Sequence, residues 1–419
     1  MRFIAPLLAL LFATPAFAGG TVSVQAPAVS IAASTNKLFH VCFVPDIQNL
    51  TSSDDHALDD DNSTCGVKSV ANGCPPNSAY CTQSPYCDTS WRNTGRRILR
   101  NMAYDLTGQW EHVDWTGMSG PNNSDGTISG ATASQDHPKC DVILSLGDNS
   151  DIDDAVVCTD PTYAGLSAGD RAKWDLATEF WQIIKASGIP YLIIPGNHDP
   201  AKPYEDLIAS LDFENKSFEY ATHTDKDQSA IIFTGPDGKP MCAIGSDYSD
   251  TNSCVRAPTA DEITWLEANS GCGGNYPTIC LEHQGVTDTG VATGRCAAMV
   301  DDADHAELIA IAGGHYTSDP GSKHDAVVDG VGEFDYIPIY ANWQEMNRHN
   351  NGSSPLYGIT VSDSAGGFVT IMAIDRANDS VTIFDYSAYW RSRKVHADAV
   401  GVYTTNSNTL SFDYDARSP

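Results

Sequence analysis

The sequence predicts an α/β fold, and three observations in one part of the chain support this class. Residues 141–146 and 190–195 are short, mainly apolar runs of the kind found in strands buried within a parallel sheet. Between them, residues 167–186 carry apolar side chains at helical spacing, and Gly188 follows as the expected C-terminal cap. A strand, a helix and a second strand in this order are typical of a right-handed βαβ unit.

The remaining elements are predicted from the same periodicities. Further strands are expected at 38–44, within 217–245 around a turn at 235–238, and at 278–282, 308–312, 336–340, 357–361, 368–374 and 381–384. Further helices are expected at 88–110, 203–211 and 258–269, the last with Thr259 as its N-cap.

The N-terminal residues indicate export, and no linker rich in Pro, Ser or Gly divides the chain into two domains. Residues 1–18 combine a single basic residue, an apolar core and a final Ala-Phe-Ala, which is the pattern of a cleaved signal peptide. Residues 19–37 are expected to form a leader, 38–390 one domain, and 391–419 a polar C-terminal tail with one weak strand. No later apolar run reaches the roughly 20 residues that a membrane span needs. We therefore expect a secreted or periplasmic protein without a membrane span.

Twelve cysteines follow the predicted signal peptide, which fits an oxidising compartment. Their grouping suggests disulfides between sequence neighbours: Cys140 with Cys158, Cys242 with Cys254, and Cys272 with Cys280. Cys42 lies inside a predicted strand and is expected in the core. The cysteines at 65–87 could instead form a zinc knuckle, but they lack the close Cys-x-x-Cys pair of such sites, so disulfides are favoured there.

The chain is strongly acidic, with 54 acidic and 24 basic residues and a formal net charge of −30. Nucleic-acid backbones and anionic membranes are bound through basic patches, so this charge argues against both as partners. A small phosphate ester held through a metal ion is compatible with it. Residues 51–64 are rich in aspartate, but they miss the spacing of an EF-hand calcium loop and are expected to be a solvated acidic loop.

Several predicted strands end in residues of the types that bind metal ions: Asp46, Asp148, Asn197, His283 and His315. Ligands gather beyond the carboxyl ends of strands in α/β sheets, so these side chains are expected to share one pocket. Carboxylate, amide and imidazole ligands together suit Zn²⁺, Mn²⁺ or Fe rather than a thiolate-dependent site. A bridging aspartate can hold two such ions about 3.5–4 Å apart, as in two-metal phosphoryl hydrolysis.

The motifs that contain these residues are Asp46-Ile47-Gln48, Gly147-Asp148-Asn149-Ser150-Asp151, Gly196-Asn197-His198-Asp199, His283 and Gly314-His315-Tyr316-Thr317. In their order and strand contexts they resemble the calcineurin-like metallophosphoesterases. That family's pattern runs Asp-x-His, Gly-Asp-x-x-Asp, Gly-Asn-His-Asp/Glu, a lone His and Gly-His-x-His. The resemblance covers residues 41 to about 317. Residues 340–344 and the β-rich end also look like the bacterial branch whose first motif is Val-Pro-Asp-x-Gln.

The resemblance implies a four-layer αββα sandwich of two mixed β-sheets flanked by helices, and hydrolysis of phosphate mono- or diesters by a metal-bound hydroxide. The implied metal ligands are Asp148 as the bridge between two divalent ions, Asp46 for the first ion, and Asn197, His283 and His315 for the second. His198 would protonate the leaving group or clamp the phosphate, and Asp151 would orient His198.

Two residues depart from the family pattern. Gln48 stands where the first motif usually has a histidine, and Thr317 stands where the last motif does. The first ion would then be held by Asp46, Gln48 and Asp148, an oxygen-rich set that favours Mg²⁺, Mn²⁺ or Ca²⁺ over Zn²⁺. The departures also leave a second class open, a secreted binding or adhesion protein with a degenerate site. Within the enzyme class, a nucleotide, a phospholipid head group and a phosphotriester all remain candidate substrates.

Overall fold

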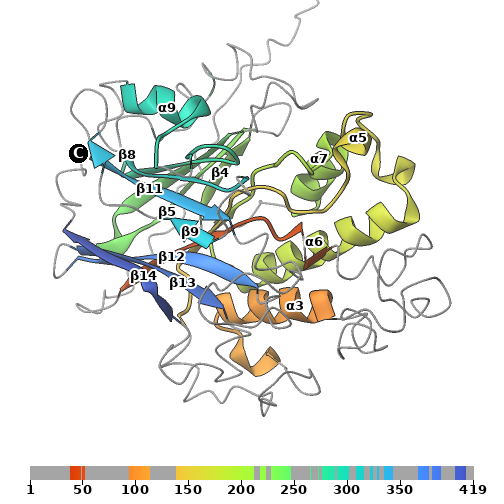
Figure 1. Ribbon diagram of the computed structural model, residues 1–419. Helices are drawn as coiled ribbons and strands as arrows, with labels where there is room; N and C mark the ends of the chain where they lie inside the picture. The colour runs from red at the N-terminus through yellow and green to blue at the C-terminus, as the bar shows by residue number, and fades with distance from the viewer. Residues whose placement is uncertain are drawn as a thin grey trace, which may run out of the picture. The chain divides into compact units, whose positions relative to one another are not determined.

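Two mixed β-sheets contain all the strands found in the described part of the chain (Figure 1). The computed structural model describes residues 38–48, 50–51, 94–113, 138–211, 218–222, 228–246, 265, 272, 276–287, 290–301, 308–315, 321–323, 328–329, 335–342, 367–376, 380–387 and 402–411. These residues lie within one compact unit that spans 32–419.

The six-stranded sheet has the order β14-β13-β12-β1-β2-β3. Strands β1, β2 and β3 are parallel to one another, and β12, β13 and β14 continue the sheet from β1 in antiparallel pairs. All residues of β2 are buried, which explains its continuous apolar sequence. The strands are β1 Phe39–Val44, β2 Val142–Ser145, β3 Tyr191–Leu192, β12 Phe368–Asp375, β13 Ser380–Ser387 and β14 Val402–Ser411.

The eight-stranded sheet has the order β10-β11-β8-β7-β6-β5-β4, with β9 paired to β11. Its centre is parallel, from β6 through β7 and β8 to β11, and antiparallel strands lie at both ends. The strands are β4 Glu219–Thr222, β5 Ser229–Thr234, β6 Pro240–Ser246, β7 Thr278–Glu282, β8 Leu308–Gly313, β9 Gly321–Lys323, β10 Val328–Asp329 and β11 Asp335–Asn342.

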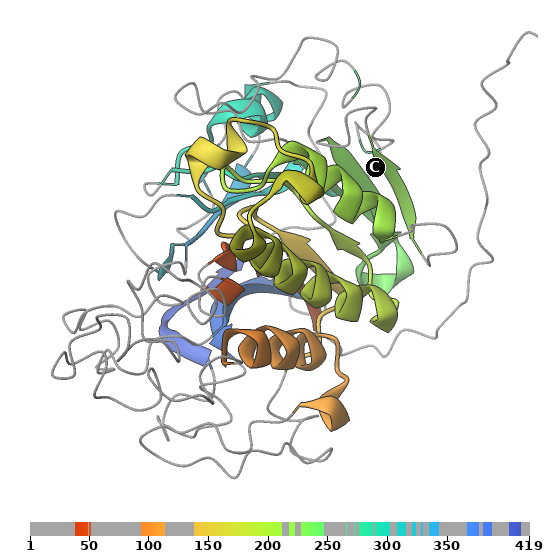
Figure 2. The same cartoon turned by 90° about the vertical axis from the view of Figure 1, so that its right-hand side faces the viewer.

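The described helices are α3 Thr94–Leu106, α5 Asp154–Val157, α6 Ala168–Ser187, α7 Ala201–Ser210 and α9 Gly294–Asp301, with 3-10 turns at Trp110–His112, Tyr163–Gly165 and Pro236–Gly238. Helix α6 begins where the Ser167 hydroxyl accepts a hydrogen bond from the Asp170 N–H, and it ends at Gly188, whose φ of 76° gives a left-handed cap. Helices α3 and α6 lie side by side (Figure 2), and Glu179 of α6 pairs with arginines of α3.

The hydrophobic core joins these elements into four layers. Between the sheets, Phe39 of β1 stacks on Phe233 of β5 with ring centroids 6.3 Å apart. On the outer side of the six-stranded sheet, Trp181 of α6 stacks on Tyr191 of β3. On the outer side of the eight-stranded sheet, α9 packs against β7 and β8. The order helix, sheet, sheet, helix confirms the predicted αββα sandwich.

Most predicted elements in the described residues are present, whereas helices α5 and α9 and the short strands β9 and β10 were not predicted. The strand expected at 190–195 is hydrogen-bonded only over Tyr191–Leu192, because the chain then turns toward the loop at 196–199. The weak strand expected in the C-terminal tail is present as β14, which pairs with β13 at the edge of the six-stranded sheet. The signal peptide at 1–18, the leader at 19–37 and the strand at 357–361 lie outside the described residues, as does all but Trp265 of the helix at 258–269.

The disulfides differ from the grouping that sequence proximity suggested. The structure pairs Cys42 with Cys140, Cys242 with Cys272 and Cys280 with Cys296. Pairing of β1 with β2 brings the two segments of the first pair together, since Cys42 lies in β1 and Cys140 lies just before β2, despite a sequence separation of 98. Cys42 is therefore both a core residue, as expected, and a cross-link. The cysteines at 65–87 lie outside the described residues.

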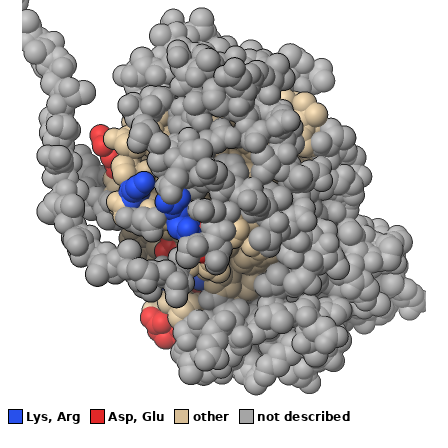
Figure 3. Space-filling view, turned by 90° about the vertical axis from the view of Figure 1, so that its left-hand side faces the viewer, with Lys and Arg blue, Asp and Glu red and all other residues tan. Residues whose placement is uncertain are grey.

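The described surface carries both signs of charge. On the face drawn in Figure 3, lysine and arginine side chains form one small group with acidic side chains near it. Among the helices that the structure describes, none has the length and apolar sequence needed to cross a membrane.

Candidate metal centre

The loops that follow β1, β2, β3, β7 and β8 meet at one end of the sandwich and bring the predicted ligands together. The ligands after each strand are Asp46 and Gln48 after β1, Asp148 after β2, Asn197 after β3, His283 after β7 and His315 after β8. All of them are buried except His315, which is partly exposed. Because the strands belong to both sheets, the site depends on the packing of one sheet against the other.

Four ligand atoms converge in the part of the centre that we call the imidazole side. His283 Nε2 lies 3.3 Å from Asp148 Oδ2, 3.1 Å from Asn197 Oδ1 and 3.3 Å from His315 Nδ1. His315 Nδ1 in turn lies 3.0 Å from the same Asn197 oxygen. Residues from four separate loops thus direct their polar atoms at a common point.

The protonation of His283 makes this convergence informative. His283 Nδ1 lies 2.6 Å from the carbonyl oxygen of Leu146, which can only accept, so Nδ1 carries a proton. In the neutral ring, Nε2 then offers a lone pair that faces a carboxylate oxygen and an amide oxygen. Ligands bound about 2.1 Å from one ion lie roughly 3.0–3.4 Å from one another in octahedral or tetrahedral geometry. The observed spacings match that range, so the donor set fits a cation.

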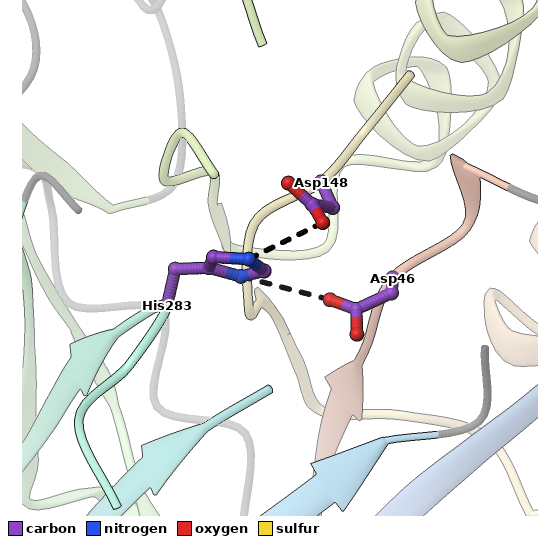
Figure 4. A group of neighbouring side chains, drawn as sticks. All are labelled: Asp46, Asp148 and His283. Atoms are coloured by element: carbon purple, nitrogen blue, oxygen red, sulfur yellow. Dashed lines mark ion pairs between the residues drawn. The ribbon is translucent and has the colours of Figure 1, made fainter. Parts of the chain in front are cut away.

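The other part of the centre, which we call the oxygen side, consists of Asp46, Gln48 and the shared carboxylate of Asp148. The Gln48 N–H donates to the Asp148 carbonyl oxygen at 3.1 Å, which places the loop after β1 against the loop after β2. Asp46 Oδ1 and both amide atoms of Gln48 are buried without a hydrogen-bond partner. Asp46, Asp148 and His283 can offer ligand atoms that all lie within 4.8 Å of one another (Figure 4).

Burial and mutual attraction shift the pKa values of this group. Burial opposes ionisation of Asp148, but His283 and His198 outweigh it and hold the pKa of Asp148 below its ordinary value. Burial raises the pKa of Asp46 to about 7, since the attraction of His283 offsets only part of that effect. Burial disfavours the charged form of His283, yet Asp148 dominates and raises the pKa of His283 to about 9. At neutral pH and without a metal ion, a proton on His283 Nε2 therefore supplies positive charge at this point, and a bound cation would take its place.

Asp199 joins the two loops that carry Asp148 and Asn197. Its Oδ2 accepts hydrogen bonds from the N–H groups of Asn149 and Gly196, both at 3.0 Å, and from Asn149 Nδ2 at 2.8 Å. Its Oδ1 accepts the Ser150 N–H at 3.0 Å. On the other side, Trp181 Nε1 of α6 donates to Asn149 Oδ1 at 2.9 Å. This network fixes the spacing between Asp148 and Asn197 from within the protein.

Two ligands hold strained backbone conformations. Asp148 has φ of 48° and His315 has φ of 71°, and Asp160 is the one other non-glycine residue with positive φ in the described residues. Left-handed backbone costs a residue with a side chain about 1–2 kcal/mol. Such strain gathers at functional sites, where surrounding contacts hold it in place.

Glycines allow the loops to approach the ligands closely. A Cβ at Gly147, whose φ is 90°, would lie 2.6 Å from His283 Nδ1. A Cβ at Gly314 would lie 2.8 Å from Asp46 Oδ1. Both positions therefore exclude larger residues for a steric reason.

The two residues expected to act in proton transfer lie beside the metal ligands. The His198 N–H donates to Asp148 Oδ1 at 3.0 Å, and His198 Nδ1 lies 2.8 Å from the carbonyl oxygen of Ile152. The Asp151 carboxylate lies 3.9 Å from Lys173 Nζ. Orientation of His198 by Asp151 stays a prediction.

The sequence located the ligands but not the groups that support them. Asp199 was part of a recognised motif without an assigned role, and the parts played by Asn149, Trp181 and the Leu146 carbonyl were missed. The available signal for Asp199 was its position directly after Asn197 and His198 in the Gly-Asn-His-Asp motif. Thr317 lies outside the described residues.

The chain matches no protein-family model, and no curated protein matches it significantly. Membership of the family that the motifs resemble therefore stays a prediction.

Proposed function

We propose that this protein is a metal-dependent hydrolase built on an αββα sandwich. Within that class we propose a phosphoesterase of the calcineurin-like type, which hydrolyses phosphate mono- or diesters. The observation that carries the proposal is the convergence of Asp148, Asn197, His283 and His315 at 3.0–3.3 Å, in the motif order of such enzymes.

The chemistry follows from which atoms the chain offers. Cations held by these ligands would lower the pKa of a coordinated water and neutralise phosphoryl oxygens. The protein's part is to hold the ligands in place, through Asp199 between two loops and through the Leu146 carbonyl on His283. Because the carboxylate of Asp148 belongs to both sides of the centre, it is the residue we propose as the bridge.

His198 is proposed as the group that supplies a proton to the leaving oxygen. Its backbone is tied to Asp148, and its Nδ1 is bound to a carbonyl, so Nδ1 carries a proton and Nε2 is left to face the substrate. The side chain is partly exposed, whereas Asp46, Gln48 and His283 are fully buried. A substrate could thus reach His198 without disturbing the ligands.

The compartment is proposed on separate grounds. Three disulfides in the described residues are typical of proteins that fold in an oxidising environment. Together with the predicted signal peptide, they support a secreted or periplasmic enzyme.

The test is hydrolysis of 4-nitrophenyl phosphate and bis(4-nitrophenyl) phosphate by the full chain, after metal removal and reloading with each of Mg²⁺, Mn²⁺, Ca²⁺, Zn²⁺ and Fe²⁺. We expect activity that EDTA abolishes and at least one metal restores. Asp175→Asn is a suitable control, because Asp175 is an exposed residue of α6 that accepts a hydrogen bond from the Tyr163 hydroxyl. Absence of turnover with every metal and both esters would contradict the proposal and favour the binding-protein alternative.

A further inference from the structure

The two sides of the metal centre offer different kinds of ligand. The imidazole side combines two ring nitrogens with an amide oxygen and a carboxylate oxygen. On the oxygen side, the described residues offer only oxygens, from Asp46, Gln48 and Asp148. His283 Nδ1 lies 3.6 Å from Asp46 Oδ1, but its proton is directed at the Leu146 carbonyl, so it is not available as a ligand there.

Gln48 is the most informative residue on the oxygen side. It is completely buried, and neither its amide oxygen nor its amide nitrogen has a hydrogen-bond partner. It lies two positions after Asp46, whose Oδ1 also has no hydrogen-bond partner, and its N–H binds the loop of Asp148. Buried polar atoms are nearly always paired, so the unpaired Gln48 amide and Asp46 Oδ1, in a loop bonded to that of Asp148, indicate a ligand or water that pairs them.

The chemistry of the unpaired atoms selects the class of ligand. Two carboxylates with an amide oxygen form a negatively charged, oxygen-only set, which suits a hard divalent cation. Imidazole nitrogens suit borderline transition ions such as Zn²⁺ or Fe²⁺. Mn²⁺ is compatible with both sets and is therefore the useful probe.

We propose that the centre is asymmetric, with a tightly held borderline transition ion on the imidazole side and an exchangeable hard divalent cation on the oxygen side. The Gln48 amide oxygen is a ligand of the exchangeable cation. This inference rests on the proposed function only in that both require a cation on the imidazole side. It adds that the two positions differ in affinity and in preferred metal, and that Gln48 sets the difference.

The experiment measures metal binding rather than activity. The metal-free full chain is titrated with Mn²⁺, and bound ions are followed by electron paramagnetic resonance and calorimetry. A second sample is loaded with Zn²⁺, dialysed and analysed for zinc. We expect two classes of Mn²⁺ site per chain that differ at least tenfold in affinity, and one zinc ion retained per chain.

Variants of Gln48 assign the weaker position. Gln48→Ala should weaken that class of Mn²⁺ site about tenfold to 100-fold and leave the tighter class unchanged. Gln48→Glu, which keeps an oxygen, should retain or strengthen Mn²⁺ binding there, whereas Gln48→His should cause a second zinc ion to be retained. Gln228→Ala is the matched control, since Gln228 is likewise completely buried with an unpartnered amide but is not one of the expected ligands.

The outcomes separate this inference from the proposed function. Two equally tight zinc ions in the wild-type chain, or Gln48 variants that bind Mn²⁺ like the wild type, would overturn the inference and leave the hydrolase proposal standing. The expected pattern of metal binding without turnover on any ester would overturn the hydrolase proposal and support the inference. Circular dichroism of each variant identifies a folding defect, in which case Gln48→Glu and Gln48→His carry the assignment.

Discussion

The loops after β1 and β2 lie against each other, but they differ in how fully their polar groups are bonded. After β2, each carboxylate oxygen of Asp148 has a partner within 3.3 Å, and Asn149 and Ser150 are bound by Asp199. After β1, Asp46 Oδ1 and the Gln48 amide have no hydrogen-bond partner. The protein's own hydrogen bonds therefore fix the loop after β2, whereas the loop after β1 needs a further group to pair its buried polar atoms.

The largest expected effect follows from removing the charge that both sides share. Asp148→Asn preserves the shape of the side chain but replaces a carboxylate oxygen by an amide group. We expect a loss of about 10³-fold in kcat/KM and the loss of at least one bound ion per chain, measured by ester hydrolysis and elemental analysis. An Asp148→Asn protein that keeps wild-type metal content would show that Asp148 is not the bridge.

A smaller effect is expected at His198, which lies beside Asp148 but offers its ring to the substrate. His198→Gln should lower kcat by about 10²–10³-fold while metal content stays the same, because the residue supplies a proton and not a ligand. His112→Gln, an exposed histidine on the 3-10 turn after α3, is the matched control and should leave kcat unchanged. Equal losses of metal and turnover in His198→Gln would contradict the assigned role.

Substitution of Asp199 tests whether its hydrogen bonds hold the loop after β2 in place. Asp199→Ala leaves three backbone N–H groups and the Asn149 amide without their acceptor, so we expect a loss of about 3 kcal/mol in the free energy of unfolding, measured with urea. Asp199→Asn retains one oxygen and should cost less. If the two substitutions cost the same small amount, the network does not hold the loop.

The smallest expected effect concerns backbone conformation. Gly147→Ala places a Cβ against His283 at a positive φ, so we expect about 2 kcal/mol of destabilisation together with weaker binding at the imidazole side. Gly188→Ala is the control: its φ of 76° is also positive, but a Cβ there meets nothing within 4 Å. We expect it to cost about 1 kcal/mol and to leave metal affinity unchanged. Urea unfolding measures the stability of both variants, and calorimetric titration with Mn²⁺ measures their metal affinity.

The sequence predicted the strands and the ligands at their ends because both depend on local patterns. Apolar runs such as β2 and β8 clearly indicate buried strands. An Asp or His shortly after such a run lies at the carboxyl end of that strand. The disulfide between Cys42 and Cys140 was not predicted, because it depends on which strands become neighbours across a sequence separation of 98. The role of Asp199 was missed for the same reason, since its donors come from a loop 50 residues earlier.

The sequence could not predict either that the side-chain amide of Gln48 is buried without a hydrogen-bond partner. The departure from the family pattern was visible, but whether the amide is buried and whether another side chain pairs with it depend on the packing of the two sheets. Because the structure shows that the Gln48 amide is both buried and unpaired, glutamine in place of the family's histidine becomes evidence for a different kind of metal position.

Anomalous X-ray diffraction from crystals of the full chain loaded with Mn²⁺ would locate the bound ion. We expect an anomalous peak about 2.0–2.4 Å from Asp148 Oδ2, Asn197 Oδ1, His283 Nε2 and His315 Nδ1. Manganese bound only elsewhere, or these four atoms joined by direct hydrogen bonds with no peak between them, would contradict the proposed metal centre.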